Sequence, residues 1–553
     1  MNIVSPPDDD LGPTTRFLLD EVRRRGIPFR RFGNSSLLML GYGCRQKKIR
    51  TAVTERTSGL GMEIASDKEE TKQLLLSNGL PIPRGYIVYD EEELQKAFSK
   101  MRPPVVIKPL NGNHGRGVTT NITSIQKAAF AFELAKRISN DVIIEEYVRG
   151  DDYRFLVVNF KLVAVAKRTP AHVIGDGKLT IRQLVDQENR NSDRGDTDFH
   201  VLAPIRIDDA TREILLDKNL TLDSVLPEGQ VLHLKTAANI SAGGTSTDVT
   251  EQVHPENAFL AERVARIFNL DICGVDIMAT RIDTPLSEGT GAIIEVNAGP
   301  GLRMHSDPTY GTKRNVAVPI IDMLFPDKIY RIPVVAVCGQ QRDVTVRLLS
   351  KMTELAGFHT GYMTDEGVFI REHPVNHLHE ETNQAFHHAQ LVLFDPTVNF
   401  AVLACPGKMK HPAFDRCDIA VLAGKDENNW DHIAKQIVHH ILPGGYLIVD
   451  ADDDAAFALS GETDAPRAFF SISADNERLK AHCENGGLGA IVENCFLTVC
   501  HGRSKVRMEE LGKIPFCEGK NERVKFVLPA LLAAFIREIP AEDIRRAIRT
   551  FVL

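Results

Sequence analysis

A lysine at the end of an apolar strand, followed by a glycine-rich loop, is the first pattern in this sequence that could do chemistry. The segment VVIKPLNGNHGRGV, Val105–Val118, places Lys108 just ahead of Gly112, Gly115 and Gly117. Glycines let backbone N–H groups approach phosphate oxygens closely, and a lysine adds a positive charge. The order differs from the GxxxxGK(S/T) of a Walker P-loop, so the pattern indicates another kind of phosphate site. Taken alone, a surface hairpin explains it equally well.

Two acids and an amide form the second pattern. GVDIMATR, Gly274–Arg281, carries Asp276, and AIIEVNAGPGLRMH, Ala292–His305, carries Glu295 and Asn297. Glu295 and Asn297 are two residues apart on an apolar strand, so their side chains share one face. With Asp276 on a neighbouring strand, these oxygens suit Mg²⁺ and nucleotide phosphates. A merely solvated face is the alternative, but it would leave acids unpaired in apolar sequence, which is costly.

A third pattern, VIIEEYVRGDDYR at Val142–Arg154, joins an apolar strand to two acids and a turn at Gly150. Such a hinge can offer backbone groups to an adenine and a carboxylate to a ribose. By itself the segment could equally be an ordinary strand end.

The elements that must position these residues follow from the hydrophobic pattern. Between Ser66 and Phe325 short β-branched runs alternate with helical stretches, which is typical of α/β or α+β proteins. We expect helices over Thr14–Arg25, Asp67–Ser77 and Ala258–Phe268, and strands over Ser35–Leu40, Val105–Ile107, Val142–Ile144, Phe155–Val158 and Leu162–Val165.

After Pro326 the pattern changes to strand-then-helix units, which predicts a doubly wound parallel sheet. The expected strands are Ile332–Val337, Phe400–Ala404, Ile419–Ala423 and Tyr446–Val449, and the expected helices are Val344–Ala356, Trp430–Leu442 and Ala541–Thr550. We therefore predict three parts: a short N-terminal region (residues 1–65), a nucleotide-binding domain (66–325) and a third domain (330–553) after which no other follows.

Composition bounds the function classes. The chain has 553 residues, 25% charged and 43% hydrophobic, as expected of a globular protein with several domains. Its net charge of −8 argues against a general nucleic-acid or anionic-membrane binder. The 9 cysteines show no CxxC spacing, which indicates reduced thiols. Neither a signal peptide nor a membrane span is visible, so we expect a cytoplasmic protein.

The order of these motifs resembles the ATP-grasp superfamily. Four strings are similar to cyanophycin synthetases in particular, and LGPTTR from Leu11 extends the likeness toward the N-terminus. They are ASDKEETK (Ala65–Lys72), HVIGDG (His172–Gly177), SAGGTSTDVT (Ser241–Thr250) and NAGPGLRMH (Asn297–His305). The resemblance implies an ATP-grasp fold followed by a Mur-ligase-like domain.

The resemblance also implies roles for individual residues. ATP would be bound by Lys68, Lys108, Asn113, His114, Gly115, Gly117, Glu145, Val148 and Asp152. Two Mg²⁺ ions would be held by Asp276, Glu295 and Asn297. The acceptor side would be lined by Ser241, Gly243, Gly244, Gly301, Arg303 and His305, and the catalytic set would be Lys108, Arg168, Arg303 and His305. A structural role is the alternative for each, more so for Ser241, Arg303 and His305, because glycine turns need their residues for backbone reasons as well.

The implied chemistry is ATP-dependent amide formation. ATP would phosphorylate a carboxylate to an acyl phosphate, which an amine then attacks while phosphate leaves. Mg²⁺ and cationic side chains would neutralise the transferred phosphoryl group, and backbone N–H groups near Gly301 would stabilise the oxyanion. Closure of the glycine loop would exclude water from the acyl phosphate.

The third domain resembles a Mur-ligase central domain that has lost its nucleotide site. The family's P-loop position is CGQQRDVT, Cys338–Thr345, where Arg342 replaces a glycine and Asp343 replaces the phosphate-binding lysine. LACPGKM, Leu403–Met409, lacks the family's metal-binding glutamate, and AGKDENNW, Ala423–Trp430, departs from its NxSxDH-like segment. We also expect the C-terminal amino-acid-binding lobe to be absent. Histidine-rich patches such as His439–His440 lack a completing acid or cysteine pattern, so a solvated face is the simpler explanation.

Ordinary cyanophycin synthetases use one site to add Asp to the backbone and a second to attach Arg. A chain with only the first resembles the type 2 enzymes, which polymerise β-Asp-Arg dipeptides. The expected partners are therefore the dipeptide, the cyanophycin chain and a second copy of the chain in a homodimer. Two alternatives stay open, namely a ligase that adds free Asp or another amino acid to a small peptide, and a non-catalytic regulatory subunit of a cyanophycin synthetase.

Overall fold

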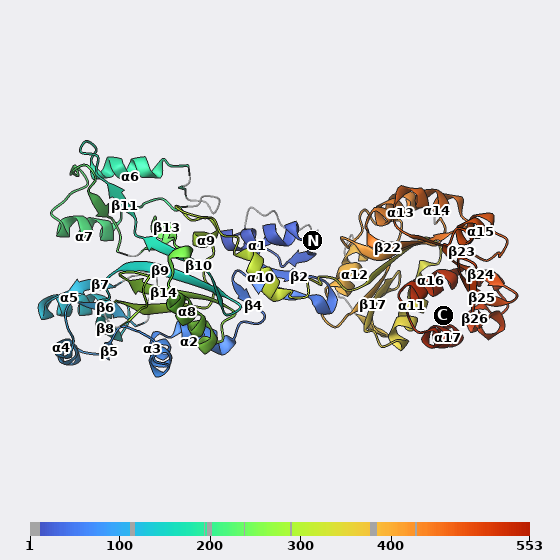
Figure 1. The fold of residues 1–553 in the computed structure, drawn as a ribbon, viewed down its shortest axis with the longest axis horizontal. Coiled ribbons are helices and arrows are strands. Elements are labelled where there is room, and N and C mark those ends of the chain that lie inside the picture. Colours follow the sequence, from blue (N-terminus) through green and yellow to red (C-terminus); the bar gives the residue numbers. More distant parts are fainter. Residues whose placement is uncertain are drawn as a thin grey trace.

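The computed structural model describes residues 11–110, 117–192, 194–195, 202–236, 238–287, 290–375, 384–425 and 429–552. The molecule is elongated, with two large bodies on either side of a smaller N-terminal region (Figure 1). Residues 59–325 build the first body, and residues after 330 build the second. Among the described helices, none is both long and apolar enough to cross a membrane.

The N-terminal region consists of a helix and a four-stranded antiparallel meander that lies between the two bodies (Figure 1). Its elements are α1 (Pro13–Arg24), β1 (Phe29–Arg31), β2 (Leu37–Leu40), β3 (Lys47–Arg50) and β4 (Val53–Thr54). Successive residues of β2 point to opposite faces. Leu38 and Leu40 join the core shared with the first body, whereas Met39 joins a core of the second.

The first body contains a small antiparallel sheet of order β5-β8-β6-β7. Its strands are β5 (Gly85–Val88), β6 (Val105–Pro109), β7 (Thr119–Ile122) and β8 (Val142–Glu146), and the helices packed on it are α4 (Glu91–Lys100) and α5 (Ile125–Lys136). The predicted strands at Val105–Ile107 and Val142–Ile144 are confirmed.

A larger antiparallel sheet of order β13-β10-β9-β14-β15 forms the centre of the first body. Its strands are β9 (Asp151–Val158), β10 (Lys161–Thr169), β13 (Thr245–Asp248), β14 (Ile272–Ala279) and β15 (Gly291–Asn297). On one face Phe155, Val165 and Val275 pack against the helix α8 (Pro255–Phe268). The opposite face is apolar at one end, where Leu156 and Ile272 meet the N-terminal region, and polar at the other.

Smaller elements complete the first body. The helices α2 (Gly59–Ser66) and α3 (Lys68–Ser77) precede the small sheet, and α10 (Ala317–Leu324) packs on α1. A separate unit, called the hairpin unit below, has its own small core. It contains the strand pair β11 (His172–Ile174) and β12 (Val231–His233) and the helices α6 (Ile181–Asn189) and α7 (Asp209–Asp217). The short helix α9 (Arg303–Ser306) follows β15.

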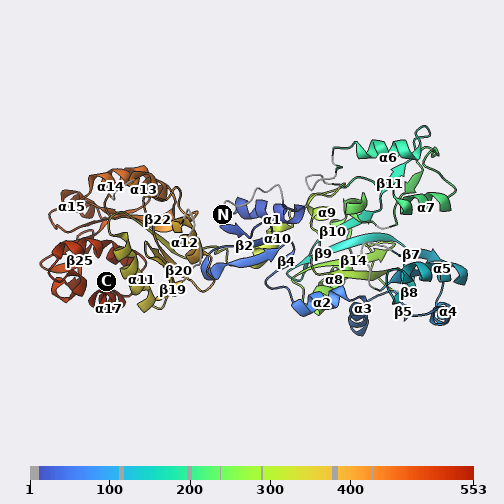
Figure 2. The same cartoon turned by 180° about the vertical axis from the view of Figure 1, so that it is seen from behind.

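The second body is an eleven-stranded sheet with helices on both faces (Figures 1 and 2). Its central strands are parallel, as predicted: β16 (Val334–Cys338), β17 (Thr360–Thr364), β20 (Phe400–Ala404), β21 (Cys417–Leu422), β22 (Ile441–Asp450), β23 (Arg467–Ser471) and β24 (Leu488–Glu493). Alternate residues of β16 enter two separate cores, which explains its continuous apolar sequence.

The prediction of a purely parallel sheet is wrong at both edges. Antiparallel strands extend it there: β18 (Gly367–Ile370) and β19 (His373–Val375) on one side, β25 (Phe496–His501) and β26 (Ser504–Glu510) on the other. The covering helices are α11 (Arg342–Leu355), α12 (Gln384–Leu393), α13 (Trp430–His439), α14 (Asp454–Leu459), α15 (Glu477–Glu484), α16 (Leu528–Ile536) and α17 (Ala541–Thr550). The predicted helix over Trp430–Leu442 ends earlier, because β22 already begins at Ile441.

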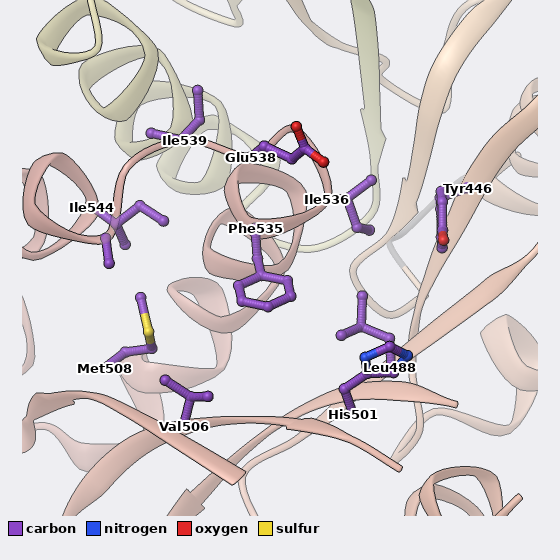
Figure 3. A pocket seen from close by; sticks show the side chains of 11 residues that line it. Tyr446, Leu488, His501, Val506, Met508, Phe535, Ile536, Glu538, Ile539 and Ile544 are labelled. Carbon is purple, nitrogen blue, oxygen red and sulfur yellow. The ribbon is translucent and has the colours of Figure 1, made fainter. Parts of the chain in front are cut away.

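An apolar pocket of about 440 Å³ lies between the β25–β26 edge and the helices α16 and α17. Phe535 of α16 points toward Val506 and Met508 of β26, and Tyr446 and His501 lie farther along the wall (Figure 3). The pocket is therefore an extension of the core on this face of the sheet.

Gly150 connects the small sheet to the large one, because β8 ends at Glu146 and β9 begins at Asp151. Its φ is +136°, and a Cβ there would lie 2.2 Å from the Ala279 carbonyl carbon. We expect Gly150→Ala to destabilise the first body by at least about 2 kcal/mol, since both backbone strain and overlap oppose a side chain. Chemical denaturation followed by circular dichroism measures this change.

Gly512→Ala is the matched control, because no atom lies within 4 Å of a Cβ built at that position. Unfolding of Gly150→Ala at the wild-type denaturant concentration would contradict this account of the connection.

Candidate active site

Four charged side chains share the polar face of the large sheet. Asp152 and Arg154 lie two residues apart on β9, Arg168 lies opposite Asp152 on β10, and Asp276 lies opposite Arg154 on β14. Asp276, Arg154 and Arg168 are buried, with 4%, 7% and 8% of their surface exposed. The alternation of the strands therefore places these charges on the face opposite the α8 core.

The two arginines bind the two aspartates directly. Arg154 forms a bidentate pair with Asp276, in which Nη2 donates to Oδ2 at 2.8 Å. Arg168 donates from Nη2 both to Asp276 Oδ2 at 2.9 Å and to Asp152 Oδ1 at 2.6 Å. Burial alone would raise the pKa of Asp276, but Arg154 and Arg168 outweigh it and hold that pKa below its ordinary value.

Glu295 adds a third carboxylate beside this cluster. It lies directly opposite Asp276 on β15, and Asn297 lies opposite Gly274, so the predicted sharing of one face by Asp276, Glu295 and Asn297 is confirmed. Glu295 keeps an exposed side, and loss of hydration on its inner side, followed by the charge of Asp276, raises its pKa. A cation placed between these groups would relieve the repulsion between the two carboxylates.

The donor set fits Mg²⁺ when part of its coordination comes from phosphate. Asp276, Glu295 and Asn297 together offer two carboxylates and one amide oxygen, the hard ligands that Mg²⁺ prefers. Among the described residues there is no group of three or more His, Cys, Asp and Glu that could hold a metal ion. These three residues would therefore hold Mg²⁺ together with nucleotide oxygens, and their role as ligands stays a prediction.

A cluster of lysines lies around a buried carboxylate at the small sheet. Lys108 of β6 and Glu145 of β8 are diagonal neighbours on one face, and Lys108 Nζ contacts Glu145 Oε1. Lys72 of α3 reaches the other oxygen, with Nζ 2.7 Å from Oε2. Burial would raise the pKa of Glu145, but Lys108 and Lys72 overcome it and lower the pKa to about 2.

Lys68 links this cluster to the acids of the large sheet. It is the first residue of α3 and lies one helical turn before Lys72. Burial lowers its pKa, the nearby Lys108 lowers it further, and Glu295 and Glu145 oppose that change. The helix α3 also packs on β15, the strand of Glu295, while its Lys72 pairs with Glu145 of the small sheet, so the residues predicted to bind phosphate and metal lie near one another.

The remaining predicted nucleotide residues are only partly within the described chain. Asn113, His114 and Gly115 lie outside the described residues. Gly117 has a φ of +70°, and a Cβ there would lie 2.6 Å from Ile138 Cδ1. Val148 follows β8 and is half-buried, and its contact with adenine stays a prediction.

The predicted acceptor residues lie at the β13 edge of the large sheet. Ser241 is exposed just ahead of the turn formed by Gly243 and Gly244, where Gly243 has a φ of +88°. A Cβ on Gly244 would lie 2.9 Å from the Thr169 carbonyl oxygen, so this turn requires glycine. Arg194 donates from Nη1 to the Gly243 carbonyl at 3.0 Å and thereby ties the turn to the hairpin unit. No pattern in the sequence indicates this role for Arg194.

Gly301, Arg303 and His305 follow β15. A Cβ on Gly301 would meet no atom within 4 Å, so packing does not demand glycine there. His305 is 2% exposed, and the residues whose charges act on it include Arg154, Asp248 and Arg168. Burial, with Arg154 adding to it, lowers its pKa to about 3, so the imidazole is neutral at neutral pH.

The second body carries a different arrangement at its topological switch point. The segment that occupies the family's P-loop position contains Gly339, which has a φ of +116°. Arg342 pairs with Asp365, and Asp343 Oδ2 accepts a hydrogen bond from the Asp365 backbone at 3.1 Å. Lys525 Nζ lies 2.7 Å from Asp450 Oδ2 at the end of β22. The charged side chains named here, beside the ends of β16 and β22, therefore pair with one another.

Comparison with known proteins agrees with this arrangement. Residues 65–175 match the family model of the RimK-like ATP-grasp domain. The chain is 39% identical over 563 residues to the cyanophycin synthetase of Trichormus variabilis and 38% identical over 562 residues to that of Synechocystis. Both matches cover 98% of this chain. The chain is thus similar to cyanophycin synthetases over nearly its whole length. It spans 62% and 64% of the length of these two relatives.

More distant relatives match about half of this chain. A glutathione biosynthesis bifunctional protein of Listeria innocua is 34% identical over 275 residues, which cover 49% of this chain and 36% of that protein. The crystal structure of a bifunctional glutathione synthetase from Pasteurella multocida is similar with a TM-score of 0.47 and 30% identity, over 58% of this chain and 45% of the other. In the cyanophycin synthetase family, by contrast, similarity continues through the second body.

The low pKa of Glu145 predicts how the free energy of unfolding depends on pH. Its folded pKa is about 2, against an ordinary value of 4.5. Because the folded value is depressed, the contribution of this group is present above about pH 4.5 and is lost as the pH falls toward about 2. We expect it to be of the order of 3 kcal/mol. The free energy of unfolding of Glu145→Gln should therefore fall less than that of wild type between about pH 5 and about pH 3.

Denaturant titrations across this pH range measure the slope. Glu92→Gln is the control, because that carboxylate is exposed and pairs only with Lys96 on the same helix. Equal slopes in wild type and Glu145→Gln would show that the buried lysines do not hold Glu145 ionised.

Proposed function

We propose that this protein is an ATP-dependent carboxylate–amine ligase that polymerises β-Asp-Arg dipeptides into cyanophycin. The observation that carries the proposal is the position of α3, which packs on β15, the strand of Glu295, and pairs through Lys72 with Glu145 of the small sheet. Similarity to cyanophycin synthetases over 98% of the chain supports the substrate class. ATP and Mg²⁺ are the expected cofactor pair.

The lysines and arginines of the site have separate tasks in this proposal. Lys68 and Lys108 bind the triphosphate by charge-assisted hydrogen bonds. When bound at Asp276, Glu295 and Asn297, Mg²⁺ would supply Lewis-acid neutralisation of phosphate oxygens. Arg168 lies beside Asp276 and stabilises the phosphoryl group as it moves.

The reaction then proceeds in two balanced steps. A carboxylate oxygen of the acceptor attacks the γ-phosphorus, ADP leaves and an acyl phosphate forms. The amine nitrogen of the incoming dipeptide attacks the acyl carbon, phosphate leaves with the former carboxylate oxygen, and the nitrogen loses a proton. The chain supplies charge, orientation and exclusion of water, and no nucleophilic serine or cysteine takes part.

Two unpartnered polar atoms indicate where the acceptor binds. Ser246 Oγ and His305 Nε2 are both buried and lack a hydrogen-bond partner among the described residues. Ser246 lies opposite Arg168 in the sheet, and His305 is near enough to feel the charges of Arg168 and Asp248. A substrate carboxylate beside Arg168 would satisfy both atoms. Because its pKa is about 3, His305 would bind substrate in neutral form and not act as a general base.

The second body serves as a scaffold in this proposal. Arg342 and Asp343 stand at its P-loop position, and Asp343 would repel nucleotide phosphates. The protein would therefore form backbone amides from a ready-made dipeptide without attaching free arginine. A homodimer is the expected assembly, and light scattering of the purified protein measures it.

Phosphate release in the presence of ATP, Mg²⁺ and a short cyanophycin primer tests the substrate. We expect release with β-Asp-Arg and none with free Asp, alone or together with Arg. Glu295→Gln should lower the dipeptide-dependent rate by at least about 100-fold, because charge on the phosphoryl group would be left unbalanced. Release with free Asp would favour the alternative amino-acid ligase, and no release with either would favour the regulatory subunit.

Calorimetric titration with ATP tests the number of sites. We expect one site per chain, and Lys108→Ala should weaken it by roughly 100-fold, as for the loss of a charge-assisted contact in a closed site. Asp343→Lys should not create a second site, because Lys525 and Asp450 still pair beside the end of β22. A second site of full strength in Lys108→Ala would contradict the scaffold role.

A further inference from the structure

Lys72 is the one member of the lysine cluster to which the proposed function gives no task. It lies one turn after Lys68 on α3, so both side chains project from the same side of the helix toward Glu145 and Lys108. The Glu145 carboxylate is 4% exposed, and each oxygen contacts a different lysine. Lys108 contacts Oε1, and Lys72 contacts Oε2 at 2.7 Å.

This arrangement constrains how Lys108 can bind a phosphate. A lysine held by a buried carboxylate must leave that carboxylate, at least in part, to reach a new anion. A buried carboxylate that loses its only cation is strongly unfavourable. Glu145 has two cations, so it can release Lys108 and still be paired.

We propose that Lys72 is a positioning residue that keeps Glu145 compensated while Lys108 turns to the triphosphate. The inference rests on the proposed function, in which Lys108 binds ATP. Lys72 acts through Glu145 and does not itself contact the nucleotide. The pairing of Glu145 with two lysines thus makes Lys108 an exchangeable ligand, whereas a single pair would hold it against the sheet.

The geometry separates this role from a direct phosphate contact. A lysine that binds phosphate directly should lose the same affinity whether or not residue 145 carries a charge. A lysine that compensates Glu145 should matter only while Glu145 is a carboxylate. A double-mutant cycle between the two positions therefore distinguishes the two roles.

The experiment is calorimetric ATP binding, with Mg²⁺, to wild type, Lys72→Met, Glu145→Gln and the double variant. We expect Lys72→Met to weaken ATP binding by at least about tenfold, because release of Lys108 would strand a buried carboxylate. Glu145→Gln has its own ATP affinity, and that affinity is the reference for the double variant. In the Glu145→Gln background, Lys72→Met should change the affinity by less than about threefold.

Three further variants keep the result interpretable. Lys72→Arg should retain wild-type affinity, since it restores the cation, and Lys72→Gln replaces Lys72→Met if the apolar side chain prevents folding. Lys96→Met, at an exposed lysine of α4 that pairs with Glu92, should leave ATP binding unchanged.

The possible outcomes separate the inference from the proposed function. An equal loss of affinity on Lys72→Met in both backgrounds would mean a direct phosphate contact and would overturn the inference alone. An unchanged affinity in Lys72→Met would also overturn it. A wild-type protein that does not bind ATP at all would overturn the proposed function, and the inference with it.

Discussion

The site depends on the mutual compensation of three buried charges and a partly exposed fourth, Asp152, on the large sheet. Asp152, Arg154, Arg168 and Asp276 come from three adjacent strands and neutralise one another by direct contact. Each of them would be costly to bury alone. The pairing therefore requires one register of β9, β10 and β14. A slip of one residue would move these charges into the α8 core and bring apolar side chains into the site.

The alternation of side chains along a strand also joins the N-terminal region to both bodies. The two faces of β2 belong to different cores, so the region is a shared layer between them. Backbone contact with the second body is close, because a Cβ on Gly43 would lie 2.3 Å from the Val398 carbonyl oxygen. The Tyr42 ring meets Phe394 edge-on, with centroids 5.4 Å apart. A second body without a nucleotide site would still matter through this contact, because it buries one face of the layer that supports the large sheet.

Much of the fold could be predicted from period and composition, because short β-branched runs mark the strands of the first body and the parallel strands are continuous apolar runs. The shared face of Glu295 and Asn297 followed from their spacing, and the register confirms it. The same spacing argument could have predicted Arg154, since it lies two residues after Asp152 on one strand. Lys72 lies four residues after Lys68 and had a helical signal of the same kind. Arg194 had none, because its contact with Gly243 spans 49 residues and depends on how the hairpin unit folds back.

The two bodies differ in how their own charges pair at the places where a phosphate could bind. In the first body Lys72 and Lys108 share the single buried carboxylate of Glu145, each contacting a different oxygen. In the second body Arg342 pairs with Asp365 and Lys525 pairs with Asp450, so each cation there already has an anion of the same chain. A phosphate that bound Lys525 would displace Asp450, whose side chain is fully buried, and an unpaired buried carboxylate is unfavourable. Glu145 of the first body could release Lys108 to a phosphate and stay paired with Lys72, and this second cation is the physical difference between the two places.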